Sequence, residues 1–173
     1  EEHLAASRPD AFLVQQDGKL RFEHYGNGQT PEVRHIVFSV TKSFIGTIAV
    51  WLIEERRLDE TARVSQYVEA LKGSAYGDAT VRQVLDMAVG VQFREDYADP
   101  TSEIALYAIA SGLGPREIPE AAKNLDSLYA FLPLLRKERE HGGFFHYVTA
   151  TTEVLGWIIE AVTKESTAQW IGK

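Results

Sequence analysis

Apolar positions alternate with polar ones in the first part of the chain and recur at helical spacing afterwards. Residues 11–16 and 20–25 form two strand-like runs on either side of Asp17, Gly18 and Lys19. An Asp-Gly pair between two such runs is typical of a tight hairpin turn, because both turn residues tolerate a positive φ angle. The pattern therefore predicts that the chain opens with two antiparallel strands.

A longer apolar run follows the turn-rich residues 26–31. Its apolar positions are three or four residues apart, as on one face of a helix: Phe44, Ile45, Ile48, Ala49 and Leu52. This spacing predicts a helix from Ser39 to about Arg57. Basic residues in the last turn of such a helix are favoured by the helix dipole.

The chain beyond residue 58 reads as helices joined by loops. Thr80 and Gln83 are spaced as a capping box, which predicts a helix that begins after Thr80 and stops near Gly90. Further segments are assigned in order: a loop at 92–101, a helix at 102–111 ended by residues 112–115, an apolar-periodic segment at 125–139 that Pro133 bends or starts, and a helix at 151–164. No internal repeat interrupts this order.

These elements predict an α+β fold with an N-terminal β-hairpin and a helical lobe. We expect one domain over residues 1–173, with the strands in 1–33 and a mostly helical part in 34–173. A chain of this length buries enough apolar surface for a real core. Two strands alone are marginal in water, so the hairpin is expected to lack partner strands that this sequence does not supply.

Composition narrows the class of partner. The formal net charge is -7 and the sequence pI is near 5.3, and the absence of a basic run argues against nucleic acid as a partner.

There are no cysteines, and the longest apolar run, 45–53, is far shorter than the roughly 20 residues of a membrane span. No signal peptide stands at Glu1, and the chain does not begin with methionine. We therefore expect a trimmed or processed start, and both a cytoplasmic and a periplasmic location stay open.

The candidate chemistry lies at the start of the first long helix. Ser39 and Lys42 are one helical turn apart, so the hydroxyl and the amine share a face. A serine becomes a nucleophile when a base takes its proton, and a lysine is such a base where its surroundings lower its pKa. With nine serines and seven lysines, roughly 0.4 pairs of this spacing arise by chance. The pair alone therefore also fits a serine cap followed by a solvated lysine.

The longer context makes the pair specific. Residues 38–44 resemble the nucleophile motif of the penicillin-recognising serine hydrolases, in the branch of class C β-lactamases, carboxylesterases and 6-aminohexanoate-dimer hydrolases. Four further segments fall in the order of that family: 17–19, 57–59, 80–87, and 144–147 with 155–157. The resemblance covers essentially the whole chain. It implies a β-lactamase/transpeptidase-like fold of which only the N-terminal part is present.

The family's second motif, Y-x-N, corresponds to Tyr147, Val148 and Thr149. The resemblance implies that the Tyr147 oxygen works with Lys42 to move the Ser39 proton, and that Thr149 contacts substrate. Threonine departs from the pattern, because a hydroxyl cannot present the N–H₂ and C=O of asparagine at the same reach. This departure weakens a β-lactam or peptidoglycan assignment and leaves ester or amide hydrolysis open.

The family's third motif, K-T-G or H-x-G on a late strand, is missing. Lys72 lies before Tyr147 in a loop, and His141 is too close to Tyr147, so neither begins that strand. In the family this strand also brings the second donor of the oxyanion hole. Loss of one such donor costs roughly 10²–10³ in rate. The C-terminal strands of the sheet are thus expected to be absent from this chain.

Weaker candidates surround this site. Tyr97 falls in a loop that, by the resemblance, lines the substrate cleft, and it is assigned as a binding residue. Glu95, Asp96 and Asp99 around it suggest either a cation site or, more simply, a solvated acidic loop. His35 is interpreted as a packed or surface residue. The sequence has no G-x-S-x-G or H-E-x-x-H motif, which argues against a Ser-His-Asp or zinc hydrolase.

The resemblance implies a serine hydrolase that needs no metal or cofactor. Ser39 would attack a small ester or amide, including a short oligomeric amide, and form an acyl-serine. Two alternatives stay open: a D-alanyl-D-alanine peptidase or β-lactamase, and a non-catalytic fragment of such an enzyme. An open hairpin edge pairs readily with added strands, so association with another chain or with the missing C-terminal part is also expected.

Overall fold

The computed structural model describes residues 2–114 and 120–172, in two compact units, Glu1–Phe38 and Ser39–Lys173. The units are described separately. No helix in these described ranges is long and apolar enough to cross a bilayer. The prediction of one domain over the whole chain stays a prediction.

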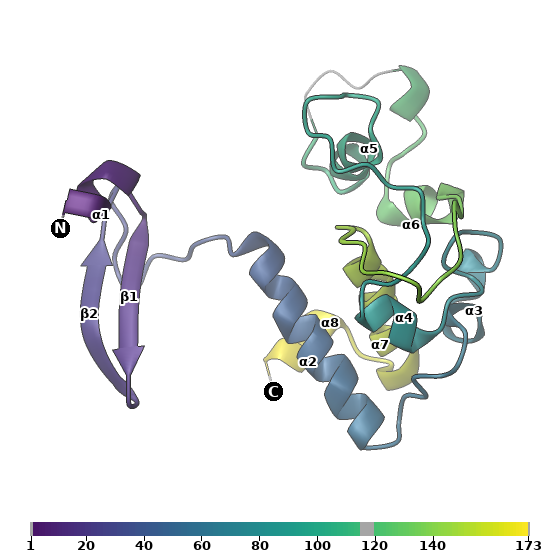
Figure 1. Cartoon of the computed structure of the whole chain (residues 1–173), viewed down its shortest axis with the longest axis horizontal. Helices are drawn as coiled ribbons and strands as arrows, with labels where there is room; N and C mark the ends of the chain where they lie inside the picture. The colour runs from purple at the N-terminus through teal and green to yellow at the C-terminus, as the bar shows by residue number, and fades with distance from the viewer. Residues whose placement is uncertain (1, 115–119, 173) are drawn as a thin grey trace. The chain divides into compact units, whose positions relative to one another are not determined.

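The first unit contains the expected hairpin. A short helix, α1 (Glu2–Ser7), precedes β1 (Ala11–Gln16) and β2 (Lys19–Tyr25), which pair antiparallel (Figure 1). Asp17 and Gly18 have φ angles of 53° and 72°, as a tight hairpin turn requires. The predicted strands are confirmed to within one residue, because the turn signal is local.

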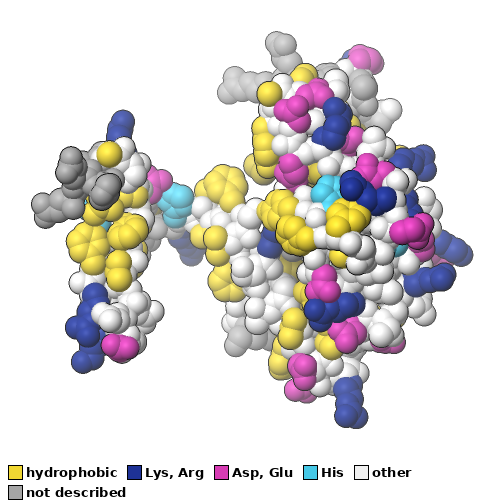
Figure 2. Space-filling view, viewed as in Figure 1, with side chains coloured by type: hydrophobic (Ala, Val, Ile, Leu, Met, Phe, Trp, Pro, Cys, Tyr) yellow, Lys and Arg dark blue, Asp and Glu magenta, His cyan; other side chains and the backbone are white. Residues whose placement is uncertain are grey.

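Apolar side chains of the hairpin are exposed. Phe12 packs edge-on against Phe22, and Val14 pairs directly with Phe22 across the strands. All three side chains are exposed, and hydrophobic atoms gather on the visible side of this unit (Figure 2). A two-stranded sheet with an open apolar face is marginal by itself. The expectation that further strands or another chain cover it stays a prediction.

The second unit is helical. After a 3-10 turn, η1 (Phe38–Val40), it contains α2 (Thr41–Glu54), α3 (Val64–Tyr67), η2 (Glu69–Leu71), α4 (Val81–Leu85), α5 (Glu103–Ala110), η3 (Glu120–Ala122), α6 (Leu128–Phe131), η4 (Leu132–Leu134), α7 (Thr151–Thr163) and α8 (Thr167–Ile171). Helix α7 packs against α2, α3 and α4, while α5 and α6 lie together at one end of the unit (Figure 1). The side chains of α7 that face this core are fully or almost fully buried: Val154, Leu155, Ile158 and Ile159.

The helix expected from Ser39 to Arg57 is shorter at both ends. Ser39 lies in η1, and α2 ends at Glu54. Arg56 adopts a positive φ of 55°, and the N–H groups of Arg57 and Leu58 both donate to the Leu52 carbonyl. This tight C-terminal turn closes the helix before the two arginines, a form of capping that apolar periodicity does not reveal.

The other predicted helices match the structure to different degrees. Thr80 and Gln83 form the predicted capping box, but α4 stops at Leu85 instead of near Gly90. The segment 125–139 contains only α6 and η4, and beyond Pro133 the backbone becomes extended at Leu135. Helices α5 and α7 match the predictions closely. The predicted stop at 112–115 is described as far as Gly114, since Pro115 lies outside the described residues.

Candidate active site

Ser39 lies in η1, the 3-10 turn that leads into α2. The preceding residue, Phe38, has a φ of 42°, in the left-handed region where a residue with a side chain is strained. Lys42 lies in the first turn of α2, and its side chain is half-buried, whereas Ser39 is exposed. The N-terminal end of this 14-residue helix favours negative charge that develops near Ser39.

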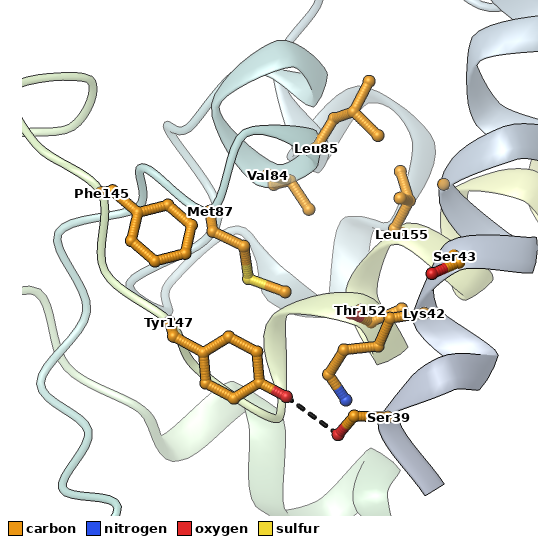
Figure 3. A pocket seen from close by; sticks show the side chains of 11 residues that line it. Ser39, Lys42, Ser43, Val84, Leu85, Met87, Phe145, Tyr147, Thr152 and Leu155 are labelled. Carbon is orange, nitrogen blue, oxygen red and sulfur yellow. Dashed lines mark hydrogen bonds between the residues drawn. The ribbon is translucent and has the colours of Figure 1, made fainter. Parts of the chain in front are cut away.

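The structure brings Tyr147 to this serine across 108 positions of the chain. The Tyr147 hydroxyl donates a hydrogen bond of 2.9 Å to Ser39 Oγ. Lys42 Nζ lies 5.9 Å from the centre of the Tyr147 ring, and its nitrogen points toward the bond between the two oxygens (Figure 3). The three residues predicted as catalytic therefore meet in one place.

These side chains open into a pocket of about 310 Å³. Its polar end is formed by Ser39, Lys42 and Tyr147, and the rest of its wall is mainly apolar (Figure 3). The other lining residues are Ser43, Gly46, Val84, Leu85, Met87, Phe145, Thr152 and Leu155. A pocket that combines apolar walls with a few convergent polar groups is the usual form of a small-molecule site.

The backbone on both sides of Tyr147 is fixed. The His146 N–H donates to the Met87 carbonyl over 2.7 Å, and the next residue after Tyr147, Val148, is completely buried. Thr149 N–H donates to the Glu95 carboxylate, also over 2.7 Å. Tyr147 thus stands as an exposed side chain on an anchored backbone.

Tyr97 and Thr149, the two predicted binding residues, lie together but do not line this pocket. The Tyr97 hydroxyl donates to Glu95 over 2.9 Å, and the Thr149 hydroxyl donates to the same oxygen over 3.2 Å. Burial of the phenol oxygen and the bond to Glu95 raise the pKa of Tyr97. We call Glu95, Tyr97 and Thr149 the Glu95 cluster.

The acidic loop around Tyr97 is largely exposed, as the simpler of the two sequence interpretations expects, and it is also held by internal hydrogen bonds. Asp99 accepts a hydrogen bond from Thr101 and forms an ion pair with Arg94. Asp96 accepts a hydrogen bond from the Ala98 N–H. These bonds order the loop from within. Among the described residues, no group of three or more His, Asp or Glu side chains is arranged to hold a metal ion.

His35 belongs to the first unit, where it pairs with Asp10 over 2.7 Å. That hydrogen bond raises the pKa of His35.

The sequence interpretation missed two kinds of site residue. Met87 and Phe145 line the pocket; they lie within the segments 80–87 and 144–147 that resemble the family, but neither was assigned as a site residue, and Met87 adopts a positive φ of 53° that only the structure reveals. The bonds of Glu95 to Thr149 join residues 54 positions apart.

A second polar group anchors the segment that leads to Tyr147. His141 Nε2 donates to Asp78 over 2.9 Å, and its Nδ1 accepts the Gly90 N–H. Lys137 adds an ion pair to the same carboxylate at 3.0 Å. Gly90 is needed here, because a side chain at this position would collide with the Arg139 carbonyl. The hydrogen bond from His141, followed by that from Lys137, lowers the pKa of Asp78 to about 2.

Replacing Asp78 by asparagine is expected to lower the free energy of unfolding at pH 7 by about 1 kcal/mol, a value reduced for solvent screening because 52% of the side chain is exposed. A lowered pKa stabilises the fold above the unfolded value of 3.8, and this contribution is lost as the pH falls toward 2. Denaturant unfolding between pH 7 and pH 2 measures it. The difference between wild type and Asp78→Asn should shrink over that range. Asp17→Asn, in the hairpin turn, is the control, and a constant difference for Asp78→Asn would contradict the assignment.

Comparison with known proteins decides the family. A family model described as Beta-lactamase matches residues 1–173. The chain belongs to the beta-lactamase family. A 6-aminohexanoate-dimer hydrolase of Paenarthrobacter ureafaciens is 39% identical over 163 residues, which make up 94% of this chain and 40% of that protein.

Solved structures similar to this chain have the same fold. A Bacillus anthracis protein, provisionally named a 6-aminohexanoate-dimer hydrolase, superposes with a TM-score of 0.86 at 32% identity, covering 96% of this chain and 43% of its own. The octameric penicillin-binding protein homologue of Pyrococcus abyssi superposes with a TM-score of 0.71 at 22% identity, covering 99% of this chain and 39% of its own. The predicted family and fold are confirmed. The chain spans about 40% of the length of these relatives.

Proposed function

We propose that this chain carries the nucleophile of a serine hydrolase that cleaves an ester or amide through an acyl-serine intermediate. The observation that carries the proposal is the 2.9 Å hydrogen bond between Tyr147 and Ser39, with the Lys42 amine directed at it. A nucleophile within hydrogen-bond reach of its base, and a further group beside the base, is the arrangement that activates a serine.

The reaction proceeds in two steps. Ser39 Oγ attacks the carbonyl carbon while its proton passes to the pair formed by Lys42 and Tyr147. That pair returns the proton to the leaving amine or alcohol as the C–N or C–O bond breaks. Water then attacks the acyl-serine, giving the acid and restoring the serine hydroxyl. Proton transfer by a placed side chain of this kind contributes about 10²–10⁴ in rate.

The Ser39 backbone N–H is proposed as one donor to the oxyanion. In the family the other donor comes from the strand that carries the third motif, which this sequence lacks. We therefore expect full activity to need the segment that supplies this strand. Labelling of Ser39 by a fluorophosphonate probe, located by peptide mass spectrometry, tests the proposal, and a protein that gives no labelled Ser39 would contradict it.

The proposed substrate is a short oligomeric amide or a related ester. The Paenarthrobacter relative is named a 6-aminohexanoate-dimer hydrolase, and Thr149 replaces the asparagine of the Y-x-N motif. A threonine hydroxyl already bonded to Glu95 offers a substrate less than a free amide would. This favours a linear amide over a β-lactam.

The protein is accordingly expected to hydrolyse the 6-aminohexanoate dimer or a p-nitrophenyl ester, and to leave nitrocefin unchanged. Release of free amine or of p-nitrophenol measures the first activity, and absorbance of opened nitrocefin measures the second. Ser39→Ala is the matched control for background hydrolysis. Nitrocefin turnover, or stable acylation by penicillin, would instead favour a β-lactamase or a D-alanyl-D-alanine peptidase.

A further inference from the structure

The loop between α4 and α5 is rigid enough to hold a side chain in place. Arg94 pairs with Asp99 at 2.7 Å and with Glu103 at 3.1 Å, which ties the loop to the first turn of α5. The Ser102 hydroxyl donates to the carbonyls of Asp96 and Asp99. Phe93 is buried directly beside this network. Glu95 therefore projects from a loop that is anchored on both sides.

Glu95 uses both carboxylate oxygens. One accepts the Thr149 backbone N–H at 2.7 Å, and the other accepts the hydroxyls of Thr149 at 3.2 Å and of Tyr97 at 2.9 Å. Hydrogen bonds to an ionised acceptor are shorter and about twice as strong as neutral ones. A half-buried carboxylate with three donors is thus a fixed link between the loop and the segment after Tyr147.

We propose that Glu95 is a positioning residue that sets the place of the Tyr147 hydroxyl relative to Ser39. The inference rests on the proposed function, because it assigns Glu95 a role in the same acylation step. Glu95 does not line the pocket, and it acts through the Thr149 backbone. The same carboxylate also holds the Tyr97 hydroxyl beside the segment that carries Tyr147.

The segment itself shows why this link matters. Upstream of Tyr147 the backbone is held by the bond from His146 N–H to Met87, and downstream Val148 and Ala150 are completely buried. Between those buried positions, the Thr149 amide is held by Glu95. Loss of that bond leaves an unpaired amide next to the catalytic tyrosine. A displacement of about 1 Å of a reacting group is enough to cost roughly 100-fold in rate.

Three substitutions of Glu95 separate reach from charge. Glutamine keeps the length and an oxygen acceptor for the Thr149 N–H but loses the charge. Aspartate keeps the charge but is one methylene shorter, so its oxygens do not reach the Thr149 amide. Alanine loses both. Positioning through this bond predicts that Glu95→Gln resembles wild type and that Glu95→Asp resembles Glu95→Ala.

The experiment measures phosphonylation of Ser39 by a fluorophosphonate probe, in which Ser39 Oγ attacks phosphorus and fluoride leaves, with its maximal rate separated from its half-saturating concentration, together with deuterium exchange of a peptide spanning residues 146–150. Glu95→Ala and Glu95→Asp are expected to lower the maximal phosphonylation rate roughly 10- to 100-fold, with the half-saturating concentration little changed, and to speed exchange at Thr149. Glu95→Gln should stay within about 5-fold of wild type in rate. Asp96→Asn, which removes a neighbouring charge of the same loop, is the matched control and should leave both readouts unchanged.

Each outcome decides the proposal. Equal losses in Glu95→Gln and Glu95→Ala would assign the effect to charge and overturn positioning, as would an unchanged rate in Glu95→Asp. If Glu95→Ala does not fold, the comparison of Glu95→Gln with Glu95→Asp still decides. A wild-type protein without labelled Ser39 would contradict the proposed function, whereas exchange at Thr149 would still show whether Glu95 holds this backbone.

Discussion

Replacing Ser39 by alanine is expected to abolish phosphonylation by a fluorophosphonate probe, a loss of roughly 10⁶-fold. The substitution removes the only oxygen that is proposed to form the covalent bond. Residual hydrolysis by background water does not produce a labelled serine. Ser39 is exposed, and its side chain accepts its bond from the exposed hydroxyl of Tyr147, so the fold should be unaffected. Labelling followed by mass spectrometry of the Ser39 peptide measures the change.

Ser65→Ala, in helix α3, is the matched control, since it removes a serine hydroxyl far along the chain from the site. Its labelling should equal that of wild type. Thermal unfolding of both variants shows whether the fold is preserved. Labelling that persists in Ser39→Ala would mean that another residue is the nucleophile, and the assignment of this site would then be wrong.

Features governed by neighbouring residues could be predicted from the sequence. The hairpin depends on Asp17 and Gly18, and the start of α4 depends on the reciprocal bonds of Thr80 and Gln83. Both signals lie within four residues. The pairing of Ser39 with Lys42 is local in the same way, because one helical turn brings them to the same face.

Features governed by the packing of distant segments could not be predicted from periodicity. The bond from Tyr147 to Ser39 spans 108 positions, and Tyr147 was assigned only because the order of motifs resembles a known family. The bond from His141 to Asp78 spans 63 positions and has no motif. In the sequence Glu95 is one of several loop carboxylates, and only its bonds to Thr149 distinguish it. Such contacts join segments that are far apart in the sequence.

The site is exposed on one side. Ser39 and Tyr147 are exposed, and the chain spans about 40% of the length of its relatives. In the first unit the apolar residues of the hairpin are exposed, and two strands are marginal by themselves. The proposed nucleophile, its proposed base and the bonds that anchor them lie in this chain, which spans about 40% of the length of its relatives.

Replacing Tyr147 by phenylalanine is expected to lower the acylation rate about 10²–10⁴-fold. The phenylalanine ring keeps the pocket wall and the contact with Lys42, so only the hydroxyl bonded to Ser39 is removed. A purely structural role of Tyr147 would cost little, because 40% of the side chain is exposed and its ring is conserved in the variant. The maximal rate of phosphonylation by the fluorophosphonate, measured together with the half-saturating concentration, separates the two roles: the rate should fall while the concentration stays nearly constant.

Tyr129→Phe provides the control, since Tyr129 is an exposed tyrosine stacked on Trp157 with ring centres 4.2 Å apart, outside the pocket lining. It should acylate as fast as wild type. A Tyr147→Phe protein with an unchanged rate would show that Lys42 alone removes the Ser39 proton, and the 2.9 Å hydrogen bond would then be only structural. A loss that approaches that of Ser39→Ala would instead make Tyr147 indispensable for proton transfer, with Lys42 in the supporting role that its place beside the tyrosine ring permits.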